Sequence, residues 1–418
     1  MMKANRALLQ DKEAFAKIQA PCPYFGSCGG CSLQDLAYAD QLALKRQRLL
    51  RSLAPLDPTL PIDIVGLDDP WRYRNKAELT FSTIPPWAPH EDRPSEAQRD
   101  GRLTIGYHAA RSFWRIIDIE DCLLLPEPMG AVLRDVRTLA QQSRLPAYNP
   151  RTHDGFFRYL LLRSSHATRK LMVCLITTQG ERGWIERLAD ELLRKHPAIT
   201  SVYWGLNAKV ADVAIPDELV LVRGEAYLDD RIGPFALKLH PQNFLQPNPI
   251  QAERLYARLC ELASHVPSGV AWDLYCGIGL VAFYLASKYR TVYGIDSDER
   301  NLEMGRLNAR DNQIRNVEFH AGRAEDLLAN KRFWLVEARP ELIVVDPPRS
   351  GLHNRVVASL LAARPRQIIY LSCNAQALMR DLHQLVSGFP RYRVRQVVAF
   401  DLFPHTDHLE VLTLLERP

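Results

Sequence analysis

The stretch Gln367-Ile-Ile-Tyr-Leu-Ser-Cys373-Asn374 is an apolar run that ends abruptly in polar residues. A similar run upstream ends in Val345-Asp346-Pro347-Pro348-Arg349. Short apolar runs bounded by turn residues are typical of strands that are buried on both faces of a parallel sheet. Ligands of an open parallel sheet bind at the carboxyl ends of its strands. We therefore expect Asp346 and Cys373 to face one pocket.

Strand-like and helix-like segments alternate from about residue 240 onward, which indicates an α/β fold with a parallel sheet. Helices fit between the first five strands, whereas the segment DLFPHTDH between the last two is too short for a crossover and predicts an antiparallel pair. The expected strands are Val270–Leu274, Thr291–Ile295, Val317–His320, Leu342–Val345, Gln367–Leu371, Gln396–Phe400 and Leu409–Leu415. Five parallel strands plus an antiparallel hairpin predict the doubly wound sheet of S-adenosylmethionine-dependent methyltransferases.

The length of 418 residues suggests two or three domains. Residues 1–60 contain three cysteines and a basic helix, which we expect at Tyr38–Leu53. Residues 61–240 are expected to form a central β-rich domain, and residues 241–418 the domain with the parallel sheet.

Composition and hydropathy favour a globular protein outside the membrane. The apolar fraction of 47% is that of a protein with a substantial core. No apolar run approaches the ~18 residues that a membrane span requires, and the charged N-terminal stretch lacks the apolar core of a signal peptide. We expect a cytoplasmic monomer.

Basic residues are concentrated at two places. The net charge of +5 permits RNA binding without demonstrating it. One group shares the expected N-terminal helix, and the other alternates along WRYRNKAEL, which would place it on one face of a strand. A solvated surface and a phosphate-binding surface are equally open for both groups. These residues are Lys45, Arg46, Arg48 and Arg51 on the helix, and Arg72, Arg74 and Lys76 on the strand.

The segment Asp273-Leu-Tyr275-Cys276-Gly277-Ile-Gly279 follows the first parallel strand and precedes a helix. Its glycines permit a tight turn and a close approach of the backbone to a ligand. Asp296 ends the next strand, where an acidic residue can bind ribose hydroxyls. A dinucleotide would require a third glycine for its pyrophosphate, and the chain has Leu280, Val281 and Ala282 there. S-adenosylmethionine, which has no phosphate, therefore fits better.

The Asp-Pro-Pro turn resembles a motif of amino methyltransferases, but Arg349 stands where their base-stacking aromatic residue should be. Methylation at carbon is the alternative. C5 of a pyrimidine becomes nucleophilic when a thiolate adds to C6, and a base must later remove the C5 proton. Cys373 suits the first role and Glu410 the second. Taken alone, Cys373 would more often be a buried strand-end thiol, but the Asp-Pro-Pro turn and the cofactor loop reverse that preference.

Four ordered motifs, DLYCGIG, VVDPPRSGL, IIYLSCN and DLFPHTDHLE, resemble those of the RNA uracil C5-methyltransferase family. The resemblance extends to HPQNFLQPN, WRYRNKAEL and the N-terminal cysteines, and so covers most of the chain. It implies that Cys373 is the nucleophile and Glu410 the proton acceptor. It also assigns further residues to the cofactor site. These are Gln246, Tyr275, Asp296 and Asp346, together with the turn glycines Gly277 and Gly279, while Arg323 falls near another cofactor position without matching its residue type.

The N-terminal sequence Cys22-x5-Cys28-Gly-Gly-Cys31 places three potential metal ligands within ten residues. The spacing alone leaves zinc and iron–sulfur open, with zinc favoured. A fourth ligand is needed, and Cys122 is the best remaining candidate. The resemblance implies a four-cysteine [4Fe–4S] cluster instead, because relatives with this spacing carry one. Only about twenty residues precede Cys22, fewer than the RNA-binding TRAM domain of many relatives, so RNA affinity is expected to come from elsewhere.

The resemblance implies that the substrate is a uridine in RNA, flipped out of its stack into the pocket. 23S ribosomal RNA is the expected target, because the iron–sulfur members mostly act on ribosomal RNA. The T-loop of transfer RNA is the alternative within the family. A non-catalytic iron–sulfur protein that binds RNA is an alternative from another class, which the presence of both Cys373 and Glu410 opposes.

Overall fold

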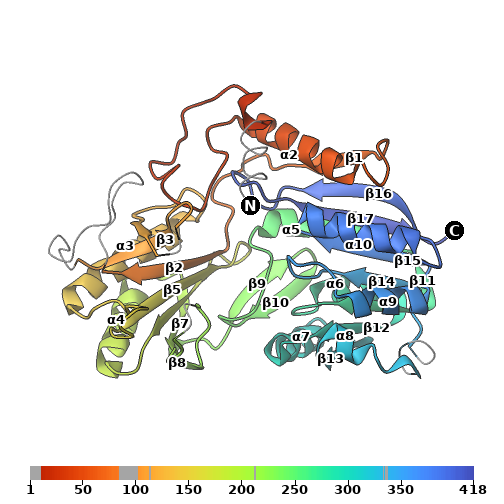
Figure 1. Ribbon diagram of the computed structural model, residues 1–418. Helices are drawn as coiled ribbons and strands as arrows, with labels where there is room; N and C mark the ends of the chain where they lie inside the picture. The colour runs from red at the N-terminus through yellow and green to blue at the C-terminus, as the bar shows by residue number, and fades with distance from the viewer. Residues whose placement is uncertain (1–10, 84–101, 113, 211–212, 333, 335–337) are drawn as a thin grey trace.

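The computed structural model describes residues 11–83, 102–112, 114–210, 213–332, 334 and 338–418. A seven-stranded sheet forms the central lobe and an eight-stranded sheet forms the C-terminal lobe (Figure 1). A two-stranded ribbon of β9 (Leu228–Ile232) and β10 (Phe235–Leu239) lies between them. In this described part of the chain, no helix is both long and apolar enough to cross a membrane.

The C-terminal sheet has the strand order β1-β16-β17-β15-β14-β11-β12-β13. The strands β15, β14, β11, β12 and β13 are parallel, and β17 is antiparallel to both β15 and β16. The predicted parallel strands and the closing antiparallel pair are thus confirmed. Their bounds are β11 Val266–Leu274, β12 Tyr289–Asp296, β13 Val317–Ala321, β14 Leu342–Val345, β15 Gln367–Ser372, β16 Arg393–Phe400 and β17 Glu410–Glu416.

One strand of this sheet comes from the N-terminal part of the chain. β1 (Ile62–Val65) pairs in parallel with β16, with Ile62 opposite Val397. Residues 62–65 therefore belong to the C-terminal sheet, although they lie within the range expected for the central domain. Four residues are too few to show which sheet they join, because the pairing partner is fixed only by tertiary packing.

Helices cover both faces of the C-terminal sheet. The alternation of side chains along β14 sends Leu342 and Val344 into one core, with α5 and α6, and Ile343 and Val345 into the other, with α2, α9 and α10. The helices are α2 Tyr38–Leu53, α5 Pro249–Leu262, α6 Leu280–Ala286, α7 Glu299–Asp311, α8 Ala324–Leu327, α9 Asn354–Ala363 and α10 Ala375–Ser387.

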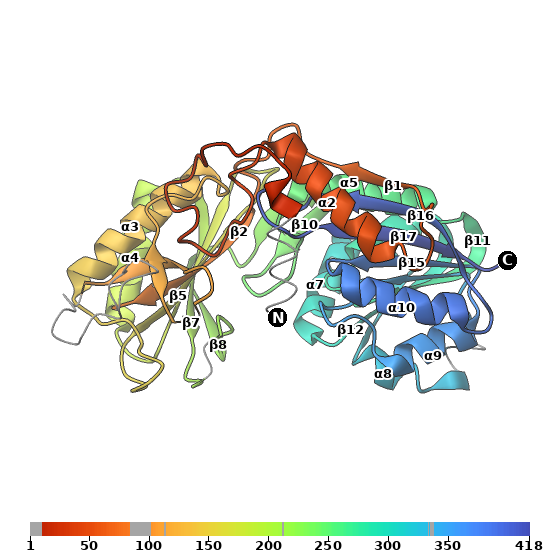
Figure 2. The same ribbon diagram turned by 45° about the horizontal axis from the view of Figure 1, so that its top comes forward.

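The predicted N-terminal helix is present as α2, but it packs on the C-terminal lobe beside α10 (Figure 2). Leu49 and Leu53 bury its apolar face in the core that contains α10. Lys45 is 2% exposed and pairs with Asp401. Lys45 is therefore neither solvated nor free to bind phosphate, which corrects both interpretations that the sequence left open for it.

The central sheet has the order β4-β3-β2-β5-β6-β7-β8. It is antiparallel except for β6 and β7, which are parallel. α3 (Glu127–Ser143) and α4 (Arg182–Lys195) cover one face, and the other face shares a continuous core with β9, β10 and α5. The strands are β2 Lys76–Ser82, β3 Thr104–His108, β4 Ile116–Asp118, β5 Phe157–Ser164, β6 Leu171–Thr177, β7 Ile199–Leu206 and β8 Glu218–Gly224.

The expected strand through WRYRNKAEL begins only at Lys76. Arg72 has a positive φ of 52°, and its guanidinium lies 3.0 Å from Asp121. Arg74 instead lines a cavity together with cysteines. The prediction that Arg72, Arg74 and Lys76 share one face of a strand was wrong, because the left-handed turn at Arg72 interrupts the alternation on which it depended.

Candidate active site

The glycine-containing turn between β11 and α6 forms one edge of the site. Tyr275, Gly277 and Gly279 all have positive φ values, of 66°, 54° and 82°. A Cβ atom at Gly279 would lie 2.5 Å from the ring of Phe319, so only glycine fits there. A Cβ atom at Gly277 would meet nothing within 4 Å. The turn is therefore packed on one side and open on the other.

Asp296, the last residue of β12, is fixed beside this turn. One carboxylate oxygen accepts a hydrogen bond from the Gly277 amide at 2.9 Å, and the other accepts one from the Asp298 amide at 2.8 Å. Asp296 and Tyr275 line a cavity of about 760 Å³ at the carboxyl ends of the parallel strands. Arg323 lines the same cavity. Its size is that of a small-molecule or cofactor site.

The turn that carries Cys373 is tied to the Asp-Pro-Pro turn. Asn374 caps α10 by accepting a hydrogen bond from the Gln376 amide at 3.0 Å. Its side-chain nitrogen donates to the main-chain oxygen of Arg349 at 2.9 Å. Cys373 is partly exposed between the buried end of β15 and this cap. One asparagine therefore fixes both strand-end turns that the sequence predicted to meet.

Cys373, Asp346 and Glu410 lie close enough to influence one another electrostatically. Burial raises the pKa of Cys373, and the negative charges of Glu410 and Asp346 raise it further, whereas Arg349 lowers it. Burial also raises the pKa of Asp346 and, together with Asp346, that of Glu410. Glu410 Oε1 is buried without a hydrogen-bond partner among the described residues. A buried carboxyl with one unpaired oxygen and a raised proton affinity is suited to accept a proton.

Asp273 connects the two groups of residues. It lies in the buried part of β11 and accepts a hydrogen bond from the Ala282 amide at 3.0 Å. Burial raises its pKa, and the charges of both Asp346 and Asp296 add to that rise. Asp296 ends β12 and Asp346 directly follows β14, the two strands that lie on either side of β11. The structure brings Tyr275, Gly277, Asp296, Asp346, Cys373 and Glu410 to one edge of the sheet.

Of the expected cofactor residues, Tyr275 and Asp296 line the 760 Å³ cavity, whereas Gln246, Gly277, Gly279 and Asp346 are not among the described residues that do so. Gln246 is buried. Its main-chain oxygen accepts a hydrogen bond from Asn75 at 3.0 Å, which anchors it to the central lobe. Phe244, two residues earlier, is 57% exposed. An exposed aromatic ring at the junction of the two lobes can stack on a nucleobase.

One residue beside the site was missed in the sequence. Tyr256 of α5 gave no signal, since it occupies an ordinary core position in the helical pattern. It is buried, and its pKa is raised by burial and by the charges of Asp346, Glu410 and Asp273.

The four predicted cluster ligands, Cys22, Cys28, Cys31 and Cys122, line one cavity. A bridge between Cys28 and Ala109, next to β3, brings the N-terminal cysteines to the central lobe. No three His, Cys, Asp or Glu side chains of the described ranges are arranged to hold a single metal ion. Arg74 also lines this cavity, and its Nε is buried without a partner within the same ranges.

The doubly wound sheet, the glycine turn and the strand-end acid define the class of S-adenosylmethionine-dependent methyltransferases. Comparison with known proteins gives the family. A family model described as tRNA (Uracil-5-)-methyltransferase matches residues 222–418. An uncharacterized RNA methyltransferase from Halalkalibacterium halodurans is 32% identical over 404 residues, covering 96% of this chain and 84% of the relative. Another, from Listeria monocytogenes, is 32% identical over 411 residues, covering 97% of this chain and 85% of the relative. The chain belongs to the RNA uracil-5-methyltransferase family and is an RNA methyltransferase.

A solved structure agrees with this placement. The tRNA (uracil-54, C5)-methyltransferase of Pyrococcus abyssi, in complex with S-adenosyl-L-homocysteine, superimposes with a TM-score of 0.72 at 28% sequence identity. The match covers 92% of this chain and 85% of that one. The fold is therefore similar over both lobes, not only over the C-terminal sheet.

Proposed function

We propose that the protein methylates C5 of a specific uridine in 23S ribosomal RNA, with Cys373 as the nucleophile and Glu410 as the base. The observation that carries this proposal is the placement of a partly exposed thiol and a buried carboxyl, one of whose oxygens has no described partner, at one edge of the sheet. Tyr275, Gly277, Gly279, Asp296, Asp346 and Gln246 are proposed to bind the cofactor.

When bound, S-adenosylmethionine supplies an electrophilic methyl group. The Cys373 thiolate adds to C6 of the flipped uracil, and the C5–C6 electron pair makes C5 nucleophilic. After C5 has taken the methyl group, Glu410 removes the C5 proton. That electron pair forms the C5–C6 double bond again, and the Cys373–C6 bond breaks to release the thiolate. Asp346 assists because its charge increases the proton affinity of Glu410.

RNA that contains 5-fluorouridine tests the nucleophile, because fluorine at C5 cannot be removed as a proton and the covalent adduct persists. The wild-type protein should form a complex that survives denaturing electrophoresis. Cys373→Ser should abolish it, while Cys260→Ser, which changes a thiol on α5, should not. The absence of an adduct with cofactor-loaded wild-type protein would contradict the proposed catalytic mechanism.

The RNA target has a second candidate, the T-loop of transfer RNA. The similar structure from Pyrococcus abyssi favours it, since that protein is named for uracil 54 of tRNA. Mapping 5-methyluridine in all RNAs of a deletion strain separates the two. Loss of the modification from 23S RNA supports the first target, and its loss from tRNA alone supports the second.

We also propose that Cys22, Cys28, Cys31 and Cys122 hold a [4Fe–4S] cluster. Three observations support it: the donor set consists of four thiols, all four line one cavity, and the buried Arg74 Nε there has no other described partner. A cluster is larger than one ion, so its ligands stand farther apart than a single-ion site requires. Anaerobically purified protein should be brown and contain iron and acid-labile sulfide. Colourless protein that contains zinc would overturn this proposal.

A further inference from the structure

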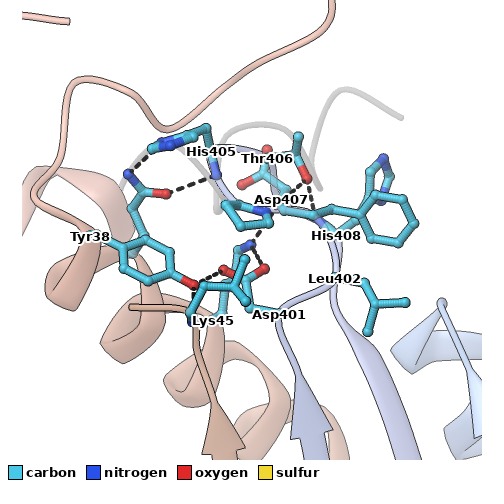
Figure 3. Close-up of polar contacts among 12 residues, drawn as sticks. Tyr38, Lys45, Asp401, Leu402, His405, Thr406, Asp407 and His408 are labelled. Carbon is cyan, nitrogen blue, oxygen red and sulfur yellow. Dashed lines mark hydrogen bonds and ion pairs between the residues drawn. The ribbon is translucent and has the colours of Figure 1, made fainter. Parts of the chain in front are cut away.

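The loop of residues 401–409 connects β16 to β17 and ends at Glu410, the first residue of β17. Its conformation therefore sets where the Glu410 carboxyl points. Residues from the beginning of the chain, in and before α2, hold the loop (Figure 3). Their bonds add to those that the loop makes with Val65 of β1, Tyr73 and Asn248. We call Ser32, Leu33, Tyr38, Gln41 and Lys45 the N-terminal clamp.

The first part of the clamp fixes the start of the loop. Lys45 Nζ lies 2.6 Å from Asp401 Oδ1, and the two side chains are 1% and 0% exposed. The Tyr38 hydroxyl donates to the other Asp401 oxygen at 3.0 Å, as Figure 3 shows. Lys45 also donates to the Phe403 main-chain oxygen at 3.1 Å. A desolvated ion pair with these added bonds permits little movement of the chain at residue 401.

The second part of the clamp fixes the middle of the loop at His405. Gln41 Oε1 accepts a hydrogen bond from the His405 amide at 3.0 Å, and Gln41 Nε2 lies 3.2 Å from His405 Nδ1. His405 has a φ of 67°, and its ring stacks on Trp71 with centroids 3.8 Å apart. A non-glycine residue in this region is strained and needs its surroundings to keep it there. Gln41 supports His405 at both its backbone amide and its imidazole ring.

The third part of the clamp comes from residues next to the cysteine cavity. The amides of Ser32 and Leu33, directly after Cys31, both donate to the His405 main-chain oxygen, at 2.9 and 3.0 Å. The Ser32 hydroxyl also donates to Asp407 at 2.7 Å. The segment that holds three of the four cysteines is thus bonded directly to the loop that precedes Glu410.

We propose that the N-terminal clamp, through Gln41 and Lys45, positions Glu410 for removal of the C5 proton and links this step to the cysteine segment. The inference rests on the proposed role of Glu410 as the base. Cys373 stands on the turn between β15 and α10, Tyr275 on the turn after β11, and Asp296 at the end of β12, so the clamp does not hold them. Loosening the clamp should slow release of the methylated RNA more than its methylation.

Gln41→Glu is the test variant, because it keeps the size of the side chain but replaces the donor Nε2 by an oxygen, which repels the Leu36 main-chain oxygen that Nε2 now bonds. Gln47→Glu is the matched control, since it makes the same change on the exposed face of the same helix. Single turnovers with unmodified RNA and labelled cofactor measure methyl transfer. Denaturing gels measure the methylated RNA that remains bound to Cys373.

We expect Gln41→Glu to release methylated RNA at least ~10-fold more slowly, because small misplacements of a catalytic group have effects of this size. The covalent adduct should accumulate while the rate of methyl transfer stays close to that of Gln47→Glu. Equal losses in both steps, or wild-type release from folded Gln41→Glu, would overturn the proposal. If Gln41→Glu does not fold, Tyr38→Phe, which removes only the hydroxyl bonded to Asp401 and Leu67, takes its place. Wild-type release from that variant would likewise overturn it.

Glu410→Gln in the same assay separates this inference from the function on which it rests. If Glu410→Gln releases RNA at the wild-type rate, the assignment of the base is wrong and the clamp inference falls with it. If Glu410→Gln accumulates the adduct and Gln41→Glu does not, the base assignment stands and the clamp inference alone is wrong.

Discussion

The side-chain nitrogen of Asn374 donates a hydrogen bond to the main-chain oxygen of Arg349 at 2.9 Å. This bond joins the two turns that follow β14 and β15, and so fixes the distance between the Asp346 and Cys373 segments. The same asparagine caps α10 through the amides of Gln376 and Ala377. Stability of the helix and geometry of the reaction site thus depend on one side chain, but through different atoms.

Asn374→Asp separates these two roles. The aspartate oxygen still caps α10, so the stability should change by less than about 1 kcal/mol. The donor to Arg349 is lost, and repulsion between the new carboxylate and the Arg349 carbonyl should displace the turn. We expect adduct formation with 5-fluorouridine RNA to slow by about 10- to 100-fold. Thermal denaturation and the rate of adduct formation measure the two effects.

The matched control is Asp298→Asn, which alters the N-cap of α7. It should leave the rate of adduct formation near that of the wild-type protein. If both variants slow adduct formation equally, the bond between Asn374 and Arg349 has no specific role.

Arg349 is the nearby residue that lowers the pKa of Cys373, while burial, Glu410 and Asp346 raise it. Adduct formation requires the thiolate, so its rate should rise with pH through and above neutrality. Arg349→Gln removes the one lowering charge and should move this rise to higher pH. Rates of adduct formation from pH 6 to about 10 give the midpoint. Arg355→Gln, at an exposed arginine that pairs with Asp326, should leave the midpoint unchanged.

Glu410 should make the protein less stable as pH rises. Its pKa is raised in the folded protein by burial and by Asp346. The folded state therefore holds its proton at pH values where the unfolded chain has released it, and unfolding becomes more favourable as pH increases. Each tenfold difference in proton affinity contributes about 1.4 kcal/mol. The stability that Glu410 contributes is fully present below its pKa in the unfolded chain. It is lost as the pH rises from there to its pKa in the folded protein.

Glu410→Gln should remove this loss. In urea denaturation, Glu410→Gln should have the same free energy of unfolding as the wild type near the ordinary glutamate pKa. At pH 8 its free energy of unfolding should be larger. Glu303→Gln, on the exposed side of α7, should show no such divergence with pH. A wild-type protein whose stability rises relative to Glu410→Gln between these pH values would contradict the assignment. The variant would be an example of stability exchanged for activity.

The sequence predicted those parts of the fold and site that depend on local order. The carboxyl ends of parallel strands share one edge, so the order of the strands placed Asp346 and Cys373 after neighbouring strand ends. The glycine turn was equally local, since glycine permits the positive φ values that Gly277 and Gly279 adopt.

The remaining features depend on contacts between distant parts of the chain. Lys45 looked like one of several surface cations, but its partner, Asp401, is 356 residues away. Tyr256 looked like core, and only the folded chain brings it within range of the charges of Asp346 and Glu410. β1 is too short for its pairing to be deduced. No periodicity can show such pairings, because they are selected by tertiary packing rather than by local conformation.

Loss of the proposed cluster should loosen the loop of residues 401–409. Ser32 and Leu33 follow Cys31 directly and donate to His405, so disorder of the cysteine segment would remove these two bonds. Cys28→Ser, at a side chain that lines the cavity, should lose iron. It should then show faster amide hydrogen exchange in peptides from 401–409, with little change in the turn of residues 275–279, which is packed on Phe319. Cys260→Ser, outside the cavity, should match the wild type in iron content and in amide hydrogen exchange. Equal acceleration in the two regions would show that the variant loosens the whole lobe and that the cysteine segment has no particular connection to Glu410.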